Sequence, residues 1–434
     1  MVVTPWGEAG ELRDRKLPPG RGQSREAVVR NQRERLYAAM VAACAEKGYE
    51  NTSVADLLEL SGVSRNAFYE HFSDREDCFI AAAKYMLGDV VTMARHLIAS
   101  EGDGEERARA VLEALLALVA MQPAAARLCL LESYVAGDRA VDAVWSGLEE
   151  INQLGLQALE EVPGSTETVP ELASAIIGGF HRVVYERLHQ GREAELPELI
   201  PHLWEWAMSY PPPPEPLRPK SRRRAGTPLS EAPPFAAYDP EQRLIRAFAA
   251  VVAEKGYAQT TIADIANAAS ISQSTFYSHF DDKADAMAAA LDSSGAQMLA
   301  AVLPAARRAQ DWKQAVRIVA GTTCGWLASE PAFARMRILA VYGAGPEAIA
   351  QRDAAGIGAM KAILSPQFES APEVGELIAE ALIGAINALL MYQVHSKGPA
   401  ALLQTAPLIT YVALTPFVGA EEACQIANGD GRRR

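Results

Sequence analysis

Cysteine, aromatic residues and long apolar runs are all scarce in this chain. No uninterrupted apolar run reaches the length of a membrane span, and the first fifteen residues lack the apolar core of a signal peptide. The five cysteines show no CxxC or other ligand-like spacing, which predicts reduced thiols in a cytoplasmic protein rather than a disulfide framework. We therefore expect a cytoplasmic protein that does not contact a membrane. The cysteines are Cys44, Cys78, Cys129, Cys324 and Cys424.

Enzyme motifs and signals for β-strands are also missing. The chain holds no GxSxG, no P-loop, no HExxH and no GxGxxG after a strand, so we expect neither an enzyme nor a bound cofactor. Ala, Leu, Glu and Arg are abundant, which predicts an all-α fold. A metal site built from His181, His189 and His202 is conceivable, but solvent-facing or hydrogen-bonded histidines are the simpler interpretation, and we expect no metal.

Basic residues are fewer than acidic residues: the chain has 41 Lys and Arg and 54 Asp and Glu, which gives a net charge of −13. This total does not exclude nucleic acid, because the field at one face matters more than the sum. Two basic stretches fit either solvated, disordered tails or, for the N-terminal stretch, an arm that contacts phosphates or the minor groove. Their residues are Arg13, Arg15, Lys16, Arg21, Arg25, Arg30 and Arg33, then Arg218, Lys220, Arg222, Arg223 and Arg224.

What the chain does contain is a long duplication. Residues Glu46–Phe79 align without a gap with Glu254–Met287, 208 residues later, and 14 of the 34 positions are identical. The match continues far beyond this motif, and near the end of each copy Ile176–His189 aligns with Leu382–His395 at an offset of 206. A unit of domain size was therefore duplicated. Between the copies lies a proline- and arginine-rich stretch that predicts an extended linker.

The duplicated motif has the pattern of a helix-turn-helix. In the first copy we expect a helix over about Arg30–Lys47, a second over Val54–Leu60 capped by Thr52 or Ser53, and a short third helix over Arg65–His71 capped by Ser64. Ser61-Gly62-Val63 forms the tight turn between the last two, and Ser73-Asp74 caps a fourth, longer helix. Two helices joined by such a turn are typical of DNA-binding proteins.

Both copies resemble the tetracycline-repressor (TetR) family of transcriptional regulators. The pattern T-x-x-D-(I/L)-x-x-x-(A/S)-G-V-S-x-x-x-F-Y-x-H-F carries the resemblance in the first copy, and a close variant carries it in the second. The family implies two three-helix DNA-binding domains, each followed by a helical domain that binds a small ligand and dimerises through its last two helices, here Ile176–Tyr210 and Leu382–Phe417. The expected parts are a flexible basic arm (1–25), DNA-binding domain 1 (26–86), ligand-binding domain 1 (87–210), a linker (211–238), DNA-binding domain 2 (239–292), ligand-binding domain 2 (293–424) and a tail (425–434).

The candidate DNA contacts follow from side-chain chemistry. Arg65 and Asn66 begin the recognition helix of the first copy and can bond guanine and adenine, while Gln273 and Ser274 take their places in the second copy without charge. The phosphate candidates are Thr52, Tyr69, His71, Arg75, Thr260, Tyr277, His279 and Lys283. Ser64 and Ser272, at the start of the two recognition helices, are further candidates for DNA binding. Alternatively, Tyr69 and His71 cap the small helical core, and Arg65 touches only the backbone. We expect Phe68, Phe72, Phe276 and Phe280 in the core.

Each copy departs from the family pattern once. The turn glycine of the first copy is Ser270 in the second, which is unfavourable if the backbone there is left-handed. Leu58 occupies a position where the family usually keeps a small alanine, which the second copy retains as Ala266.

The C-terminal part of each copy is a set of apolar helices interrupted by Gly and Pro. An unknown small apolar effector would bind there, although aromatic residues at helical spacing are more often core. The Gly178-Gly179 pair predicts close helix packing. The candidates for the ligand pocket are Tyr134, Trp145, His181, Trp326, Phe333 and Tyr342.

The sequence thus predicts a regulator, by family default a ligand-responsive repressor, that binds double-stranded DNA with two recognition helices from one chain. Because the two helices differ, an intramolecular pseudo-dimer would prefer an asymmetric operator; like copies pairing between chains, as a homodimer, is the structural alternative. In a third interpretation one or both DNA-binding modules are vestigial, and the protein binds a small molecule or a partner.

Overall fold

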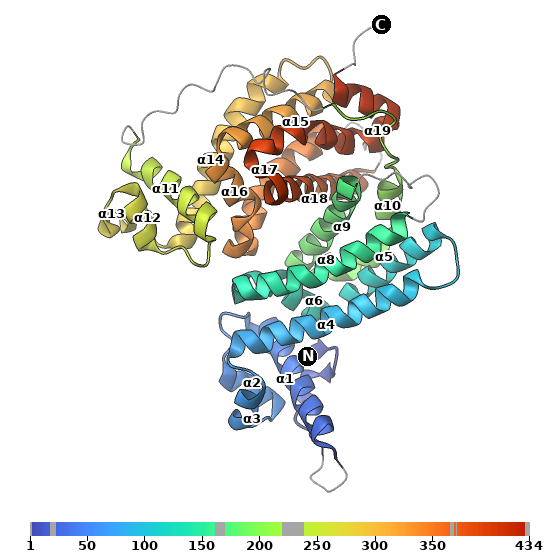
Figure 1. Ribbon diagram of the computed structural model, residues 1–434, viewed down its shortest axis with the longest axis vertical. Helices are drawn as coiled ribbons and strands as arrows, with labels where there is room; N and C mark the ends of the chain where they lie inside the picture. Colours follow the sequence, from blue (N-terminus) through green and yellow to red (C-terminus); the bar gives the residue numbers. More distant parts are fainter. Residues whose placement is uncertain are drawn as a thin grey trace. The chain divides into compact units, whose positions relative to one another are not determined.

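The computed structural model describes residues 2–17, 23–160, 170–218, 238–364, 369 and 371–429. Within these residues all regular secondary structure is helical except for one short hairpin, which confirms the all-α prediction (Figure 1). It divides into two compact units, Met1–Val162 with Val184–Ile200, and Pro163–Val183 with Pro201–Arg434. Parts of the sequence predictions lie outside the described residues: Arg21, Lys220, Arg222, Arg223, Arg224, most of the linker and the end of the tail.

The first unit contains most helices of the first copy, and the last two, α9 and α10, are divided between the two units. They are η1 (Ala9–Glu11), α1 (Arg25–Lys47), α2 (Val54–Ser61), α3 (Arg65–His71), α4 (Arg75–Ile98), α5 (Gly104–Met121), α6 (Pro123–Arg127), the π-helical turn η2 (Leu128–Glu132), α7 (Ser133–Ala136), α8 (Asp138–Glu160), the second half of α9 (Pro170–Gln190), η3 (Glu193–Glu195) and the start of α10 (Leu196–Met208).

The second unit contains the whole second copy together with the first half of α9 and the rest of α10. Its own helices are α11 (Pro240–Lys255), α12 (Ile262–Ala269), α13 (Gln273–Tyr277), α14 (Lys283–Ala306), α15 (Trp312–Ser329), α16 (Pro331–Ile338), η6 (Ala340–Ala344), α17 (Pro346–Leu364), α18 (Pro372–Lys397), η8 (Pro399–Gln404) and α19 (Ala406–Asn428).

The N-terminal residues form a structure where we expected a flexible arm. Strands β1 (Val3–Thr4) and β2 (Gly7–Glu8) pair as an antiparallel hairpin, and η1 follows. Leu12 is fully buried in the core of the first copy, and the Trp6 ring lies 5.7 Å from that of Tyr37. The prediction of a flexible arm is therefore wrong for residues 2–17, because these apolar side chains gain from burial against the helical core.

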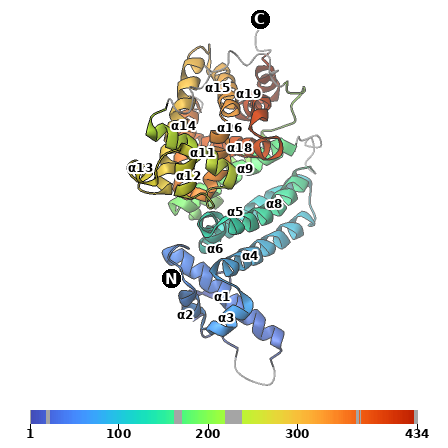
Figure 2. The same cartoon turned by 60° about the vertical axis from the view of Figure 1, so that its left-hand side comes forward.

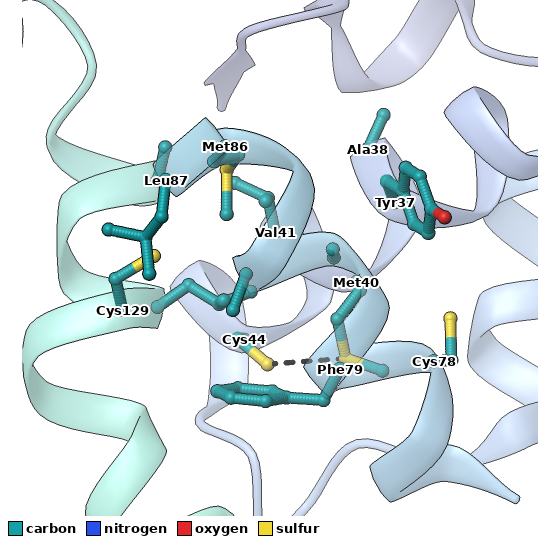
Figure 3. Packing of buried hydrophobic residues seen from close by; sticks show 14 of the residues in the cluster. Tyr37, Ala38, Met40, Val41, Cys44, Cys78, Phe79, Met86, Leu87 and Cys129 are labelled. Carbon is teal, nitrogen blue, oxygen red and sulfur yellow. Dashed lines mark hydrogen bonds between the residues drawn. The ribbon is translucent and has the colours of Figure 1, made fainter. Parts of the chain in front are cut away.

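The first DNA-binding module packs α2 and α3 against α1, as both views show (Figures 1 and 2). Phe68 and Phe72 lie in this core, as expected. The core continues through α4 into the C-terminal part of the copy, where Leu87 of α4 lies beside Cys129 of η2 (Figure 3). A continuous apolar core of this kind transmits strain between the parts it joins.

All five cysteines are unpaired and buried, in agreement with the predicted reduced thiols. Burial raises the pKa of Cys44 to about 12 and that of Cys129 to about 12, so neither is a reactive thiolate at neutral pH.

In the second unit, helices from both copies pack closely. A Cβ atom built on Gly178 of α9 would lie 2.9 Å from the carbonyl oxygen of Gly384 in α18, and one on Gly179 would lie 2.9 Å from that of Ala381. Only glycine allows the two helix backbones to approach this closely, so the predicted close packing at Gly178-Gly179 is confirmed.

The end of the first copy is attached to α19 by hydrogen bonds. The Tyr210 hydroxyl donates to the carbonyl of Val412 at 3.0 Å, and the Tyr411 hydroxyl donates to that of Pro211 at 2.6 Å. Burial raises the pKa of Tyr210 well above its usual value, so it remains a donor. Farther along, the Arg218 amide donates to the Asn428 side chain at 2.7 Å.

Two helices, α14 and α18, are long and apolar enough on average to cross a membrane, judged by length and composition alone. This differs from the sequence prediction, which considered only uninterrupted apolar runs. In α18, 67% of the apolar window is buried inside the protein.

Candidate DNA interface

The helix-turn-helix is built in the same way in both copies. The Ser53 side chain accepts from the Asp56 amide while the Asp56 carboxylate accepts from the Ser53 amide, and Thr261 with Asp264 repeats this capping box. Lys47 forms an ion pair with Asp56 at 2.8 Å, and Lys255 forms one with Asp264 at 2.7 Å. These cations and the cap lower the pKa of Asp56 and bring that of Asp264 to about 2.

The tight turn is left-handed in both copies. Gly62 has φ 62° and Ser270 has φ 53°, and Ser270 is the sole non-glycine residue with positive φ in the described part of the chain. The concern about this serine is therefore confirmed: a Cβ atom in this conformation costs on the order of 1 kcal/mol.

An arginine of the first helix holds each turn, a role that sequence reasoning missed. An Nη of Arg35 donates to the Ser61 carbonyl at 2.6 Å, and an Nη of Arg243 donates to the Ala269 carbonyl at 2.6 Å. Arg35 is 4% exposed. The available signal was that Arg35-Leu36 and Arg243-Leu244 align at the offset of 208, but an alignment alone does not say which carbonyl an arginine will cap.

The recognition helix of the first copy, α3, presents its polar side chains to solvent. It covers Arg65–His71, as predicted, and Ser64 caps it by accepting from the Ala67 amide. Arg65 and Asn66 are exposed in its first turn, and Tyr69 is 51% exposed although it is an aromatic residue. An exposed guanidinium, amide and phenol on one short helix have the chemistry to bond base edges and phosphates.

The recognition helix of the second copy, α13, is shorter and uncharged at these positions. It covers only Gln273–Tyr277, capped by Ser272, and its first-turn side chains are Gln273 and Ser274, both exposed. Tyr277 is 56% exposed, matching Tyr69. The two helices therefore offer different hydrogen-bonding groups at equivalent positions.

Thr52 and Thr260, which we predicted as phosphate contacts, instead stabilise the loop between the first two helices of each module. The hydroxyls of Thr52 and Thr260 donate to Gly48 and Gly256 at 2.8 and 2.7 Å, and both threonines are at most 2% exposed. In this structure their hydroxyls face the protein, so a direct phosphate contact would require them to turn outward.

The same loop is clamped by the first residue of the fourth helix. An Nη of Arg75 donates to the carbonyl of Tyr49 at 3.0 Å and to that of Thr52, and its guanidinium lies 4.0 Å from the Tyr49 ring centre. Lys283 repeats this in the second copy, with Nζ 2.8 Å from the Tyr257 carbonyl and 4.2 Å from the Tyr257 ring. Arg75 and Lys283 are thus held in place by the loop whether or not they also contact phosphate.

The two histidines differ in environment. His71 Nε2 lies 2.8 Å from the side-chain oxygen of Gln32, and burial, aided by the charge of Arg33, lowers its pKa. His279 is exposed. At neutral pH His71 is therefore an uncharged hydrogen-bonding group rather than a cation.

The effector-pocket candidates lie on different helices. Trp326 and Phe333 are buried in the core of the second copy, with ring centres 6.2 Å apart, and Arg352 lies 5.1 Å from the ring centre of Tyr342. The remaining three, Tyr134, Trp145 and His181, are half-buried on α7, α8 and α9. In the described part of the chain, no three His, Cys, Asp or Glu side chains gather as a metal site. The pocket assignment remains a prediction.

Comparison with known proteins matches both helix-turn-helix segments to one family model. Residues 36–82 and 244–290 match the model described as bacterial regulatory proteins, tetR family. The chain is 25% identical over 126 residues to the HTH-type transcriptional activator FasR of Mycolicibacterium smegmatis, covering 29% of this chain and 58% of FasR. It is 36% identical over 83 residues to the HTH-type transcriptional repressor AcnR of Corynebacterium glutamicum, covering 19% of this chain and 42% of AcnR.

The matched segments thus span about half the length of these curated relatives. Both relatives are named as transcriptional regulators and not as enzymes. Among solved structures, the FadR regulator of Bacillus subtilis in complex with stearoyl-CoA aligns at 20% identity with a TM-score of 0.38, over 40% of this chain and 96% of that protein.

Proposed function

We propose that this chain, which belongs to the tetR family of bacterial regulatory proteins and carries two of its DNA-binding modules in tandem, is a cytoplasmic transcriptional regulator that binds duplex DNA through α3 and α13 of one polypeptide. The observation that carries the proposal is the presence of two complete helix-turn-helix modules, each with a capping box, a left-handed turn and exposed polar residues on the second helix.

The pairing that we propose is intramolecular. A usual family member presents two identical recognition helices by pairing two chains, whereas here the first half of α9 packs against α18, and Tyr210 bonds to α19, within one unit. The covalent linker would further raise the effective concentration of one copy near the other. The chain would then act as a pseudo-dimer.

Such a pseudo-dimer would prefer an asymmetric operator. Arg65 can make two hydrogen bonds to guanine and Asn66 two to adenine, whereas in the second copy Gln273 suits adenine, Ser274 is less selective, and neither is charged. The two half-sites would therefore differ in sequence. The half-site that binds α3 would contribute more of the electrostatic attraction between the protein and the DNA.

Regulation would be allosteric. An apolar effector in one or both C-terminal parts would favour an arrangement of the modules that binds operator poorly, and by linkage would itself bind more weakly when operator is present. In the first copy the coupling would pass through η2, whose Glu132 carboxylate accepts from the Tyr49 amide at 2.8 Å in the loop that Arg75 clamps.

Selection of bound sites from a random duplex pool by the purified full chain tests the proposal. We expect a two-part, asymmetric site, with Arg65→Ala relaxing the sequence preference in one half and Gln273→Ala relaxing it in the other. Loss of preference at the same positions of both halves would refute intramolecular pairing. A perfect palindrome would indicate like-with-like pairing between chains.

A second candidate function has support from the second module. Its recognition helix is shorter, its turn contains the strained Ser270, and the first-turn residues Gln273 and Ser274 carry no charge. In this alternative only the first module binds DNA, and the second copy serves as a partner- or effector-binding half. A selected site with a single conserved half, insensitive to Gln273→Ala, would favour it.

A further inference from the structure

The contact between α9 and α18 is reciprocal. A Cβ atom on Gly178 would lie 2.4 Å from the Cβ of Ala388, and one on Gly384 would lie 2.4 Å from the Cβ of Arg182. At the offset of 206, Gly384 corresponds to Gly178 and Ala388 to Arg182. Gly178 of the first copy thus meets Ala388 of the second, and their equivalents, Gly384 and Arg182, meet in the same way. Such reciprocal contacts are the signature of a two-fold, isologous interface.

The side chains beside this axis break the symmetry. Arg182 of the first copy extends to Asp353 in α17 of the second, with an Nη–Oδ distance of 3.1 Å, and the two side chains are 7% and 2% exposed. The equivalent of Arg182 is Ala388. Gly137 and Gly345 precede α8 and α17 at the offset of 208, so the equivalent of Asp353 is Trp145. The ion pair therefore forms once, from a base of the first copy to an acid of the second.

Asp353 has other partners in its own copy. Arg352 donates to both of its carboxylate oxygens, at 2.7 and 3.0 Å, and the Asn387 side chain donates at 3.0 Å. Burial opposes its ionisation, but the charges of Arg352 and Arg182 hold the pKa of Asp353 below its usual value. The carboxylate is thus an ionised acceptor, prepared by the second copy, that receives an arginine from the first.

We propose that the Arg182–Asp353 pair is a specificity determinant that selects pairing of the first copy with the second over pairing of like copies. This rests on the proposed intramolecular pseudo-dimer and identifies what enforces it. In a pair of two first copies, two Arg182 side chains would be buried near one axis, with Trp145 in place of each acid. An arginine buried without an acid is strongly disfavoured, whereas the pair itself adds little net stability over apolar side chains.

The ion pair disfavours one kind of like pair more than the other. In a pair of two second copies, Ala388 would meet Gly384, and Asp353 would retain Arg352 and Asn387. The discrimination therefore acts mainly against self-pairing of the first copy. It follows that an apolar residue at position 182 should weaken the discrimination against like pairs of the first copy while preserving the packed interface.

The experiment uses the full chain with a protease site inserted after Arg224, cleaved after folding so that the two halves are no longer tethered. Native mass spectrometry then separates mixed pairs from the two kinds of like pairs by mass. Isotopically labelled and unlabelled samples are mixed in sub-denaturing urea until label exchange is complete, so that the composition reflects equilibrium. We expect almost only mixed pairs from the wild-type chain, and a several-fold rise of like pairs of the first copy in Arg182→Met, toward the half of all complexes that random sorting would give.

Two controls isolate the charge. Arg187→Met removes another buried arginine of α9, whose ion-pair partner Glu195 lies in the same copy, and should leave only mixed pairs. Arg182→Lys keeps the charge and should restore most of the discrimination, and thermal melting of each cleaved variant checks that it is folded. Only mixed pairs in Arg182→Met would overturn the inference while leaving the pseudo-dimer intact. Like pairs in the wild type, or a doubled mass of the uncleaved chain, would overturn the pseudo-dimer itself.

Discussion

At the scale of single residues, the turn of the second module holds a serine in a conformation that suits glycine. Ser270 has φ 53°, and its equivalent Gly62 has φ 62°. We predict that Ser270→Gly stabilises α12 and α13 by about 0.5–1 kcal/mol, because relief of left-handed strain outweighs the extra chain entropy of glycine. Native-state hydrogen exchange of these two helices measures it.

The reverse change in the first module is the matched control. Gly62→Ser should destabilise α2 and α3 by about 1 kcal/mol or more, since a Cβ atom there would also lie 3.2 Å from Cγ of Arg13. If Ser270→Gly left the exchange protection unchanged, the serine would not be strained in solution.

The ionisation of His71 is a second residue-scale prediction. Burial and Arg33 lower its pKa, so its NMR titration should have a midpoint below the ordinary value of about 6.5, and Arg33→Ala should raise that midpoint. Because protons bind more weakly to the folded state, His71 contributes stability at neutral pH that is lost as the pH falls through 6.5 and below. A His71 midpoint that did not respond to Arg33→Ala would contradict this assignment.

At the scale of elements, the loop clamp is equivalent in the two copies although its residue differs. Arg75 and Lys283 both donate to loop carbonyls and lie over a tyrosine ring. We predict that Arg75→Ala destabilises the first module by about 1.5–3 kcal/mol, the usual range for hydrogen bonds to a charged group, while Arg75→Lys costs much less. Urea unfolding monitored in the first module tests this.

The same variants separate clamping from phosphate binding. If Arg75 only clamps the loop, Arg75→Lys should preserve both stability and DNA affinity. If DNA affinity falls while stability is preserved, the guanidinium also makes a phosphate contact that a lysine cannot reproduce. Lys283→Arg in the second copy provides the converse comparison.

Local signals let the sequence predict the helix-turn-helix in detail. The bounds of α3, the cap at Ser64 and the close packing at Gly178 agree with the structure because each depends on residues near one another in sequence or on a single missing side chain. The N-terminal hairpin and the loop clamps were missed, since Leu12 and Arg75 act through partners that only the folded chain brings near. The Arg182–Asp353 pair joins residues 171 positions apart, and no periodicity identifies such a partner.

At the scale of the whole molecule, duplication followed by divergence has produced two unequal halves. The first copy has the recognition helix that begins with Arg65, the N-terminal hairpin and Arg182, and the second has the uncharged recognition helix and the acid at Asp353. A homodimer must keep both halves of its interface and both half-sites identical. A tandem chain is free of that constraint, so that the surfaces that bind DNA and those that pair the copies can diverge together.

The unequal recognition helices lead to a prediction about operator symmetry. Replacing Gln273 and Ser274 by Arg and Asn gives both modules the same first-turn residues as Arg65 and Asn66. We predict that the Gln273→Arg/Ser274→Asn variant selects a more palindromic site, gaining guanine and adenine preference in the half that the wild-type chain specifies less strongly. Its affinity should also fall more steeply with salt, by about one unit of slope, because one more cation approaches the DNA.

The converse variant is the control for this prediction. Arg65→Gln/Asn66→Ser should also make the site more symmetric, but with weaker binding and a salt dependence shallower by about one unit, since the first module loses its cation. Increased symmetry with opposite changes in salt dependence would show that α3 and α13 each contact one half of the same operator. If the Gln273→Arg/Ser274→Asn variant selected the wild-type site with an unchanged salt slope, α13 would not contact DNA, and the second copy would have kept the fold of a DNA-binding module while losing its use.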